Sequence, residues 1–300
     1  MLKSILRKKP LVSFYVLTFI ITWGIWSPLI IHYFSSPYQV SFSTVPIPLI
    51  LLAFLGFFGP SIAGIIMTGV EKGSAGVRGL LSRWKILRIG AQWYLLAFLS
   101  QVFIDFASTQ IAINVFSLDV AIDASKWHYF LPILLRSAFI GGAIAEETGW
   151  RGYALPKTME SRNALFSSIV IGLFWAVWHL PLCFIPGANF PVPLSPEVFL
   201  VFTVNVVFIS IILAALNNNA RGSLFICYLY HIMLNTSLFS GIFHFADPVQ
   251  AWWIKICCSA ILHGILAIVI VIVLGPARLA RGRDAAPASP RYLGEHRGVV

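Results

Sequence analysis

The chain has 300 residues, of which 58% are hydrophobic and only 11% are charged, and its mean hydropathy is +0.85. A soluble globular domain carries roughly 45–50% apolar and about 25% charged residues. The charges here are too few to cover a molecule of this size in water, so the composition excludes a soluble fold and requires the lipid bilayer as solvent. The net charge of +10 has to be interpreted from where the charges lie along the chain.

Long apolar runs divide the chain into candidate membrane spans, since a helix needs about 20 mostly apolar residues to cross the hydrocarbon. The first run is too long for a signal peptide and no small-x-small cleavage site follows it, so we expect it to be retained. Helices satisfy their own backbone hydrogen bonds, which predicts an all-α, polytopic membrane helical bundle and a multi-pass protein of the plasma membrane. The eight predicted transmembrane helices cover residues 11–34, 45–70, 91–114, 129–155, 164–185, 197–216, 223–243 and 251–274.

The basic residues indicate the orientation, because Lys and Arg stay on the cytoplasmic side. The two termini and every second connection hold 18 of the 21 basic residues, whereas the opposite connections hold only Lys126 among several acidic residues. We therefore predict that both termini are cytoplasmic. On this interpretation the charge reflects topology and attraction to anionic membrane lipid, and no nucleic-acid partner is expected.

The domain organisation predicted from these spans is simple. Residues 1–275 form a single transmembrane helical domain, and residues 276–300, rich in Arg, Ala and Pro, form a disordered basic cytoplasmic tail. The four cysteines show no CxxC or Cys/His spacing, which favours buried thiols over disulfides or a zinc ribbon. No internal repeat is evident, which weakens the interpretation as an inverted-repeat transporter.

Few ionisable or strongly polar side chains fall inside the predicted spans. Each ionisable group at bilayer depth costs about 2.5–3.5 kcal/mol on insertion scales, so each is a candidate for function. We expect Asp105 and Arg136 to pair across spans three and four and His263 to be a core residue, and we assign no chemistry to these three. The residues that we single out are Asp105, Arg136, Glu146, Glu147, His179, His231, Asn235 and His263.

The fourth span ends in the segment AIAEETGWRGYALP, which contains two adjacent carboxylates. Neighbouring helical positions point about 100° apart, so Glu146 and Glu147 face different partners, while Glu147 and Arg151 at i,i+4 share a face and can pair. This division leaves Glu146 free to act as a general base. The alternative is an ion pair that only anchors the end of a helix at the membrane interface.

The fifth and seventh spans carry the remaining polar groups. A lone histidine such as His179, set among aromatic residues, is more often a core residue than a catalyst. His231 and Asn235 at i,i+4 present two hydrogen-bond donors to one point, which suits them to stabilise an oxyanion. Alternatively they hold two helices together. Counted from the cytoplasmic ends of their spans, Glu146, His179 and His231 reach similar depths, which favours one shared site.

Together these residues resemble the motif series of a known family. Glu146-Glu147-x-x-x-Arg151, Trp175-x-x-x-His179 and His231-x-x-x-Asn235 are similar, in order and position, to the motifs of the CPBP (CAAX protease and bacteriocin-processing, or Abi) intramembrane proteases, which include the type II CAAX prenyl endopeptidase. The resemblance covers about residues 129–240, the predicted catalytic core. The family usually has Phe where this chain has Trp175, and we expect that exchange to leave the chemistry unchanged.

The resemblance implies peptide-bond hydrolysis inside the membrane. By motif position, Glu146 with His179 activates the attacking water, His231 and Asn235 stabilise the oxyanion, and Glu147 with Arg151 holds the site together. The family is named as metalloproteases, and a divalent metal such as zinc, if present, would take Glu146, His179 and His231 as ligands. Because HExxH is absent and the ligands come from three helices, we favour hydrolysis without an obligatory metal.

Two other classes of function remain as alternatives. The buried carboxylates and histidines are also compatible with a proton-coupled transporter, and the family fold is compatible with a non-catalytic scaffold or bacteriocin-immunity protein. For the protease, the expected partners are membrane lipid and a peptide or protein substrate at the membrane. The resemblance implies a lipidated protein, a leader peptide or another target as the substrate, and no residue of the sequence distinguishes these.

Overall fold

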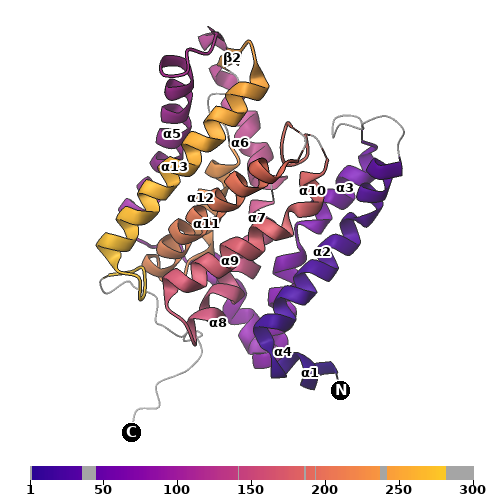
Figure 1. Ribbon diagram of the computed structural model, residues 1–300. Helices are drawn as coiled ribbons and strands as arrows, with labels where there is room; N and C mark the ends of the chain where they lie inside the picture. The colour runs from indigo at the N-terminus through magenta and orange to yellow at the C-terminus, as the bar shows by residue number, and fades with distance from the viewer. Residues whose placement is uncertain are drawn as a thin grey trace.

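The computed structural model describes residues 2–35, 45–140, 142–185, 187–192, 194–236 and 242–281. These residues form a bundle of helices with one small sheet (Figure 1). The helices are α1 (Leu2–Lys8), α2 (Pro10–Ser35), α3 (Ile47–Gly56), α4 (Gly59–Ser82), α5 (Ala91–Asn114), α6 (Phe130–Phe139), α7 (Ala143–Glu147), α8 (Leu155–Met159), α9 (Ala164–Trp178), α10 (Leu180–Cys183), α11 (Pro196–Asn219), α12 (Leu224–Leu234) and α13 (Pro248–Leu274). Two 3-10 helices, Arg83–Lys85 and Ala124–Tyr129, and a π-helix, Thr148–Ala154, complete the helical structure.

The predicted polytopic bundle is confirmed. Within the described residues, six helical stretches are long and apolar enough to cross a membrane, and they correspond to the first, second, third, fourth, sixth and eighth predicted spans. The fifth and seventh spans are shorter than predicted, because α9 has 15 residues and α12 has 11. The helix α9 ends two residues after Ala176, close to Pro181, which has no amide hydrogen to extend the helical ladder.

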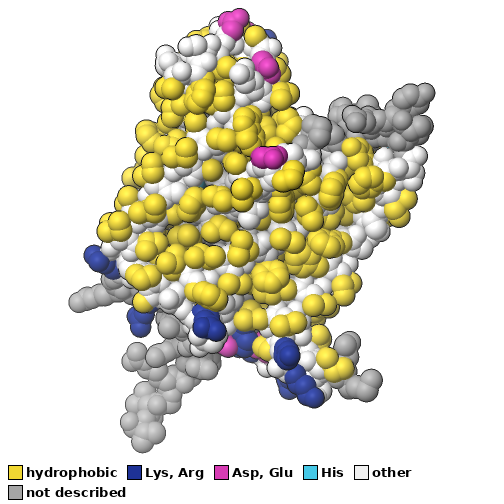
Figure 2. Space-filling model, in the orientation of Figure 1, with side chains coloured by type: hydrophobic (Ala, Val, Ile, Leu, Met, Phe, Trp, Pro, Cys, Tyr) yellow, Lys and Arg dark blue, Asp and Glu magenta, His cyan; other side chains and the backbone are white. Residues whose placement is uncertain are grey.

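The surface is that of a protein solvated by lipid. Large apolar side chains such as Ile20, Phe103 and Ile272 are more than 60% exposed. Figure 2 shows a broad apolar surface across the face in view, with most Lys and Arg side chains at the end where α1 and α8 lie and Asp and Glu side chains mainly towards the opposite end. A surface this apolar is unstable in water but stable in hydrocarbon, so the protein is a multi-pass membrane protein.

The fourth span is broken where the sequence predicted one continuous helix. The helix α6 ends at Phe139, Gly142 has a left-handed φ of 82°, and α7 then runs directly into the π-helix Thr148–Ala154. A positive φ is accessible to glycine at low cost because glycine has no Cβ. The break starts a new helical direction just before the two glutamates, and π-helices are frequent at functional sites.

The π-helix packs closely against α4 through small residues. A Cβ on Gly149 would lie 2.3 Å from the carbonyl carbon and oxygen of Pro60, and one on Gly64 would lie 3.2 Å from the Cα of Gly149. Small residues let the backbones of membrane helices approach each other in this way. The contact sets the position of the segment that carries Glu147 and Arg151.

Arg83 connects the π-helix to the start of α12. Its guanidinium donates hydrogen bonds to the backbone carbonyls of Gly152 at 2.8 Å, Arg151 at 3.2 Å and Gly222 at 2.7 Å. Hydrogen bonds from a charged donor to buried carbonyls are stronger than neutral ones. One side chain therefore holds together two elements that contribute residues to the predicted site.

The first residues of the predicted tail contact the bundle. The carbonyl oxygens of Pro276 and Ala277 accept hydrogen bonds from the first amides of α9, and Asn219 Nδ2 donates to the carbonyl of Leu279, a fully buried residue. Residues 276–281 are therefore fixed against the bundle. Residues 282–300 of the predicted tail, and residues 36–44 of the first outer connection, lie outside the described residues.

The small sheet was not predicted. Strand β1 (Val120–Ile122) pairs in antiparallel register with β2 (Phe243–Phe245), so that Ala121 lies opposite His244. Three residues are too few to show a period-two pattern in the sequence. The sheet connects the segment after α5 to the segment before α13.

The contact between the π-helix and α4 predicts a large effect of Gly149→Ala. The added methyl group meets the Pro60 carbonyl, which belongs to the backbone and cannot rotate away, so we expect a loss of about 1–3 kcal/mol in the free energy of unfolding. Unfolding of the purified protein by SDS titration from mixed micelles measures this. Gly24→Ala is the matched control, because a Cβ there has no atom of the described residues within 4 Å. Equal stability of the two variants would contradict the packing argument.

Candidate active site

The six predicted site residues come from three parts of the bundle. Glu146 and Glu147 end α7 and Arg151 lies in the π-helix, His179 caps the end of α9, and His231 and Asn235 lie at the end of α12. The helices α7, α9 and α12 lie in the middle of the molecule (Figure 1).

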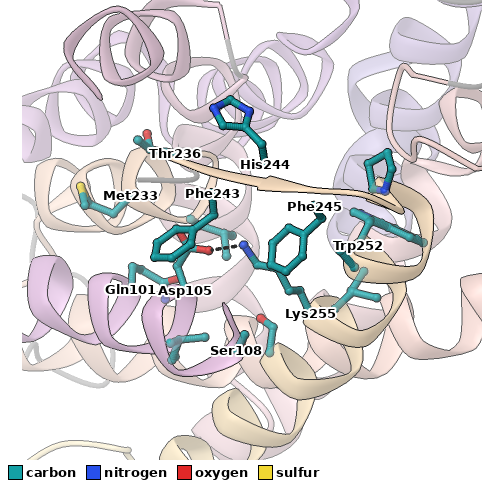
Figure 3. A pocket seen from close by; sticks show the side chains of 16 residues that line it. Gln101, Asp105, Ser108, Met233, Thr236, Phe243, His244, Phe245, Trp252 and Lys255 are labelled. Atoms are coloured by element: carbon teal, nitrogen blue, oxygen red, sulfur yellow. Dashed lines mark ion pairs between the residues drawn. The ribbon is translucent and has the colours of Figure 1, made fainter. Parts of the chain in front are cut away.

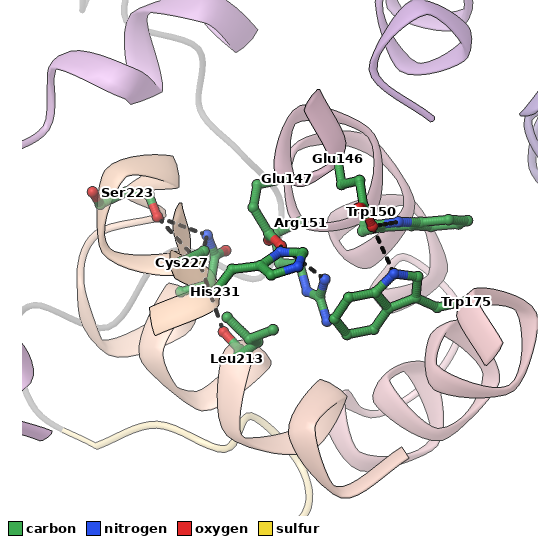
Figure 4. A network of polar contacts seen from close by, with 10 residues as sticks. Glu146, Glu147, Trp150, Arg151, Trp175, Leu213, Ser223, Cys227 and His231 are labelled. Carbon is green, nitrogen blue, oxygen red and sulfur yellow. Dashed lines mark hydrogen bonds and ion pairs between the residues drawn. The ribbon is translucent and has the colours of Figure 1, made fainter. Parts of the chain in front are cut away.

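Glu147, Arg151 and His231 form a buried network around one carboxylate oxygen. Arg151 Nη1 donates to Glu147 Oε1 at 3.2 Å, and His231 Nδ1 lies 2.8 Å from the same oxygen (Figure 4). All three side chains are at most 4% exposed. The i,i+4 pair of Glu147 with Arg151 is confirmed. The contact of His231 with Glu147 was missed, because 84 residues separate them.

The hydrogen-bond partner of His231 limits what its ring can donate. Glu147 pairs with Arg151 as a carboxylate, and a carboxylate only accepts hydrogen bonds. Nδ1 of His231 therefore carries the hydrogen in this contact. A neutral imidazole has only one N–H. His231 can therefore donate through its other nitrogen, Nε2, only when the ring carries a second proton and a positive charge.

Glu146 faces a different set of partners, as the helical spacing predicted. Its Oε2 accepts a hydrogen bond from Trp175 Nε1 at 2.7 Å and a longer one from Trp150 Nε1 at 3.4 Å (Figure 4). The side chain is 1% exposed. Gly142 makes room for it, since a Cβ there would lie 2.5 Å from Glu146 Oε1. Both indole donors were missed, although Trp150 follows Glu146 at i,i+4.

The indole ring of Trp175 also contacts the ion network. The guanidinium carbon of Arg151 lies 4.5 Å from the ring centroid, a cation–π distance, and the His231 ring lies 5.3 Å away in an edge-on arrangement. Figure 4 shows the indole between Glu146 on one side and Arg151 and His231 on the other. The hydrogen bond to Glu146 is one that the phenylalanine of the family motif could not make.

His179 is held by the backbone of the same tryptophan. Its Nδ1 lies 2.9 Å from the carbonyl oxygen of Trp175, and because a carbonyl only accepts, Nδ1 carries the hydrogen. In the neutral ring, Nε2 is then the nitrogen with a lone pair. His179 is half-buried and packs edge-on against Trp178 at 4.6 Å.

Asn235 caps α12 one turn after His231. Its backbone N–H donates to the His231 carbonyl at 3.1 Å, and its own carbonyl accepts from Ser137 Oγ at 2.8 Å. The half-buried residue is thus fixed at the helix end that carries His231. That its amide points to the same spot as the His231 ring stays a prediction.

The residues do not form a metal centre as they are arranged. In the part of the chain that the structure describes, no group of three or more His, Cys, Asp or Glu side chains is close enough to hold a metal ion. Of the three ligands predicted for zinc, Glu146 gives Oε2 to two indoles and His231 gives Nδ1 to Glu147. These contacts leave Nε2 of each histidine and Oε1 of Glu146 available, but the three residues are not grouped closely enough for a three-ligand site, and we derive no step through a metal.

A cavity of about 510 Å³ lies outside this site, between α5, α13, β2 and the end of α12 (Figure 3). Asp105 of α5 pairs there with Lys255 of α13 at 3.0 Å. The sequence suggested Arg136 as the partner of Asp105 and did not single out Lys255. His263 is fully buried, as predicted, and contacts Gln101 at 3.0 Å. The four cysteines are free thiols, as predicted.

The buried ion network predicts that Arg151→Met destabilises the protein strongly. The change leaves the Glu147 carboxylate buried without its cation, which costs about 3–5 kcal/mol. We expect the double variant Glu147→Gln, Arg151→Met to recover part of the loss in SDS-titration unfolding. Glu160→Gln is the control. Glu160 pairs with Lys157, but its side chain is 41% exposed, so losing that pair should cost less than about 1 kcal/mol in the free energy of unfolding. Similar losses for Arg151→Met and Glu160→Gln would be inconsistent with a desolvated network.

Comparison with known proteins supports the resemblance that the motifs indicated. Residues 127–237, which contain all six site residues, match the family model described as type II CAAX prenyl endopeptidase Rce1-like. The chain is also 24% identical over 234 residues to a protein of Methanococcus maripaludis named CAAX prenyl protease 2, an alignment that covers 74% of this chain and 81% of that protein. Motifs, family model and relative agree, and they support a type II CAAX endopeptidase-like family for this multi-pass membrane protein.

Proposed function

We propose that this protein is an intramembrane endopeptidase that hydrolyses a peptide bond with a water molecule activated by Glu146 and His179. The observation that carries the proposal is the buried cluster itself. Two adjacent glutamates have separate partners, one within an ion network and one among neutral indole donors. A carboxylate held in place without a paired cation is suited to accept a proton.

Glu146 acts as the general base in this mechanism. Its carboxylate takes a proton from the attacking water, and the lone pair of His179 Nε2 accepts a hydrogen bond from the same water. The 2.9 Å contact from His179 Nδ1 to the Trp175 carbonyl supports this role, because it leaves Nε2 as the acceptor. Proton transfer by a positioned group of this kind contributes about 10²–10⁴-fold to a rate.

His231 and Asn235 stabilise the oxyanion that forms when water adds to the peptide carbonyl. Donors held in place in a dry site stabilise that charge better than water does. His231 performs this role as an imidazolium, with Nδ1–H directed to Glu147 and Nε2–H to the oxyanion. The buried Glu147 carboxylate supports the positive ring, and Arg151 pairs with Glu147 and orients it.

The substrate we propose is a lipidated protein or peptide that stays at the membrane. The relative from Methanococcus maripaludis is named a prenyl protease for CAAX sequences. A prenyl chain partitions into hydrocarbon, and the apolar surface of this protein keeps the site within the same layer. A leader peptide is the alternative substrate.

The proposal predicts that Glu146→Gln abolishes cleavage. Glutamine keeps the shape and still accepts from both indoles, but it cannot take up the water proton, so we expect turnover of a prenylated reporter peptide in proteoliposomes to fall at least about 10²-fold. The SDS-titration midpoint should stay close to wild type, which separates chemistry from folding. Glu160→Gln is the matched carboxylate control and should cleave at the wild-type rate. Wild-type turnover by Glu146→Gln would refute the role of Glu146, and substrate flux without cleavage would favour a transporter.

We propose that cleavage does not depend on a metal. Because the described residues supply no three-ligand cluster, we expect the purified protein to retain its activity after dialysis against EDTA and in the presence of 1,10-phenanthroline. Elemental analysis of the same sample by mass spectrometry measures any bound zinc. Loss of activity with chelator and its return on adding zinc would contradict this expectation.

A further inference from the structure

Trp175 links the two groups that the proposed mechanism assigns to water activation. Its indole N–H donates to Glu146 Oε2 at 2.7 Å, and its backbone carbonyl accepts from His179 Nδ1 at 2.9 Å. Glu146 comes from α7 and His179 from the end of α9. One residue therefore fixes the carboxylate through its side chain and the histidine through its backbone.

The other donor to Glu146 is a weaker anchor. Trp150 Nε1 lies 3.4 Å from the same oxygen, beyond the usual range for an N–H···O hydrogen bond. Without the Trp175 N–H, the carboxylate would keep only this long contact and could rotate about its last bond. A displacement of about 1 Å at a reacting group can cost about a hundredfold in rate.

We propose that Trp175 is a positioning residue, whose indole N–H holds Glu146 in the orientation required for proton abstraction. This inference rests on the proposed function. It corrects the expectation that tryptophan and phenylalanine are equivalent at this position, because the two rings fill similar space but only the indole donates. The ring contacts with Arg151 and His231 need an aromatic face and no N–H, so either ring can make them.

A purely structural role would use the same contacts differently. Trp175 is 2% exposed, and a buried indole N–H requires a partner whatever its function. If the hydrogen bond only satisfied the indole, losing it would change stability and leave the turnover of the folded protein unchanged. The test must therefore remove the N–H while keeping the ring, and must measure turnover and stability separately.

The experiment replaces Trp175 by 3-benzothienylalanine, incorporated by nonsense suppression. This residue keeps the bicyclic shape and has sulfur in place of the N–H. The control is the same replacement at Trp26, a fully buried tryptophan of α2 whose Nε1 donates to the Ala53 carbonyl at 2.8 Å. Each replacement removes one hydrogen bond from a buried indole. The bond lost at Trp175 is to Glu146, whereas the bond lost at Trp26 is to a backbone carbonyl outside the candidate site.

We expect the replacement at Trp175 to lower kcat on the prenylated reporter by about tenfold to a hundredfold, the range for loss of a hydrogen bond to a charged group. KM should change less than about twofold, because the contact is to the base and not to the substrate. The replacement at Trp26 should leave kcat within about twofold of wild type. Equal kcat for wild type and the Trp175 replacement would overturn the inference.

A spectroscopic measurement tests the hydrogen bond without activity. In protein labelled with ¹⁵N-tryptophan, the indole signal lost in Trp175→Phe identifies Trp175, and Glu146→Gln should move that signal while leaving the Trp26 signal in place. An unmoved Trp175 signal would show that the contact is absent and overturn the inference.

The activity of Glu146→Gln separates the inference from the proposed function. If Glu146→Gln is inactive and the Trp175 replacement turns over normally, the proposed function stands and the role of Trp175 is refuted. If Glu146→Gln cleaves normally, both are refuted, because Trp175 would then hold a carboxylate that takes no part in the reaction.

Discussion

The burial of one carboxylate constrains the centre of this molecule. Glu147 is fully buried in a bundle whose solvent is hydrocarbon, where an unpaired charge would cost several kcal/mol. Arg151 and His231 both contact its Oε1, one from the π-helix and one from α12. These two elements therefore have to keep a fixed distance. The hydrogen bonds from Arg83 and the close contact at Gly149 both act to maintain it.

The ion network also determines what the neighbouring glutamate can do. Arg151 and His231 both contact Glu147, and neither donates a hydrogen bond to Glu146 among the contacts of the described residues. Neutral indoles hold Glu146 instead. A neutral donor orients a carboxylate without forming an ion pair with it. Two adjacent residues of the same type thus have different surroundings, to which the proposed mechanism gives a structural role and a chemical role.

The parts of this arrangement that follow from local spacing could be predicted from the sequence. Long apolar runs located six of the eight spans, and the i,i+4 rule predicted the pair of Glu147 with Arg151. The contacts of His231 with Glu147 and of Trp175 with Glu146 join residues 84 and 29 positions apart. No local rule predicts such pairs, because they depend on how the helices pack. The break at Gly142 was missed for a related reason, since apolar runs do not show where a helix changes direction.

The two helices that are shorter than predicted are those that end at the site. His179 is the C-terminal cap of α9 and Asn235 is that of α12. At membrane depth, non-helical backbone is tolerated only where protein buries it or where it lines a cavity. A helix C-terminus also carries partial negative charge, so the last turn of α12 suits the imidazolium that the proposed mechanism gives to His231. The end of α12 brings His231 to Glu147, and the end of α9 holds His179 beside Trp175, whose indole donates to Glu146.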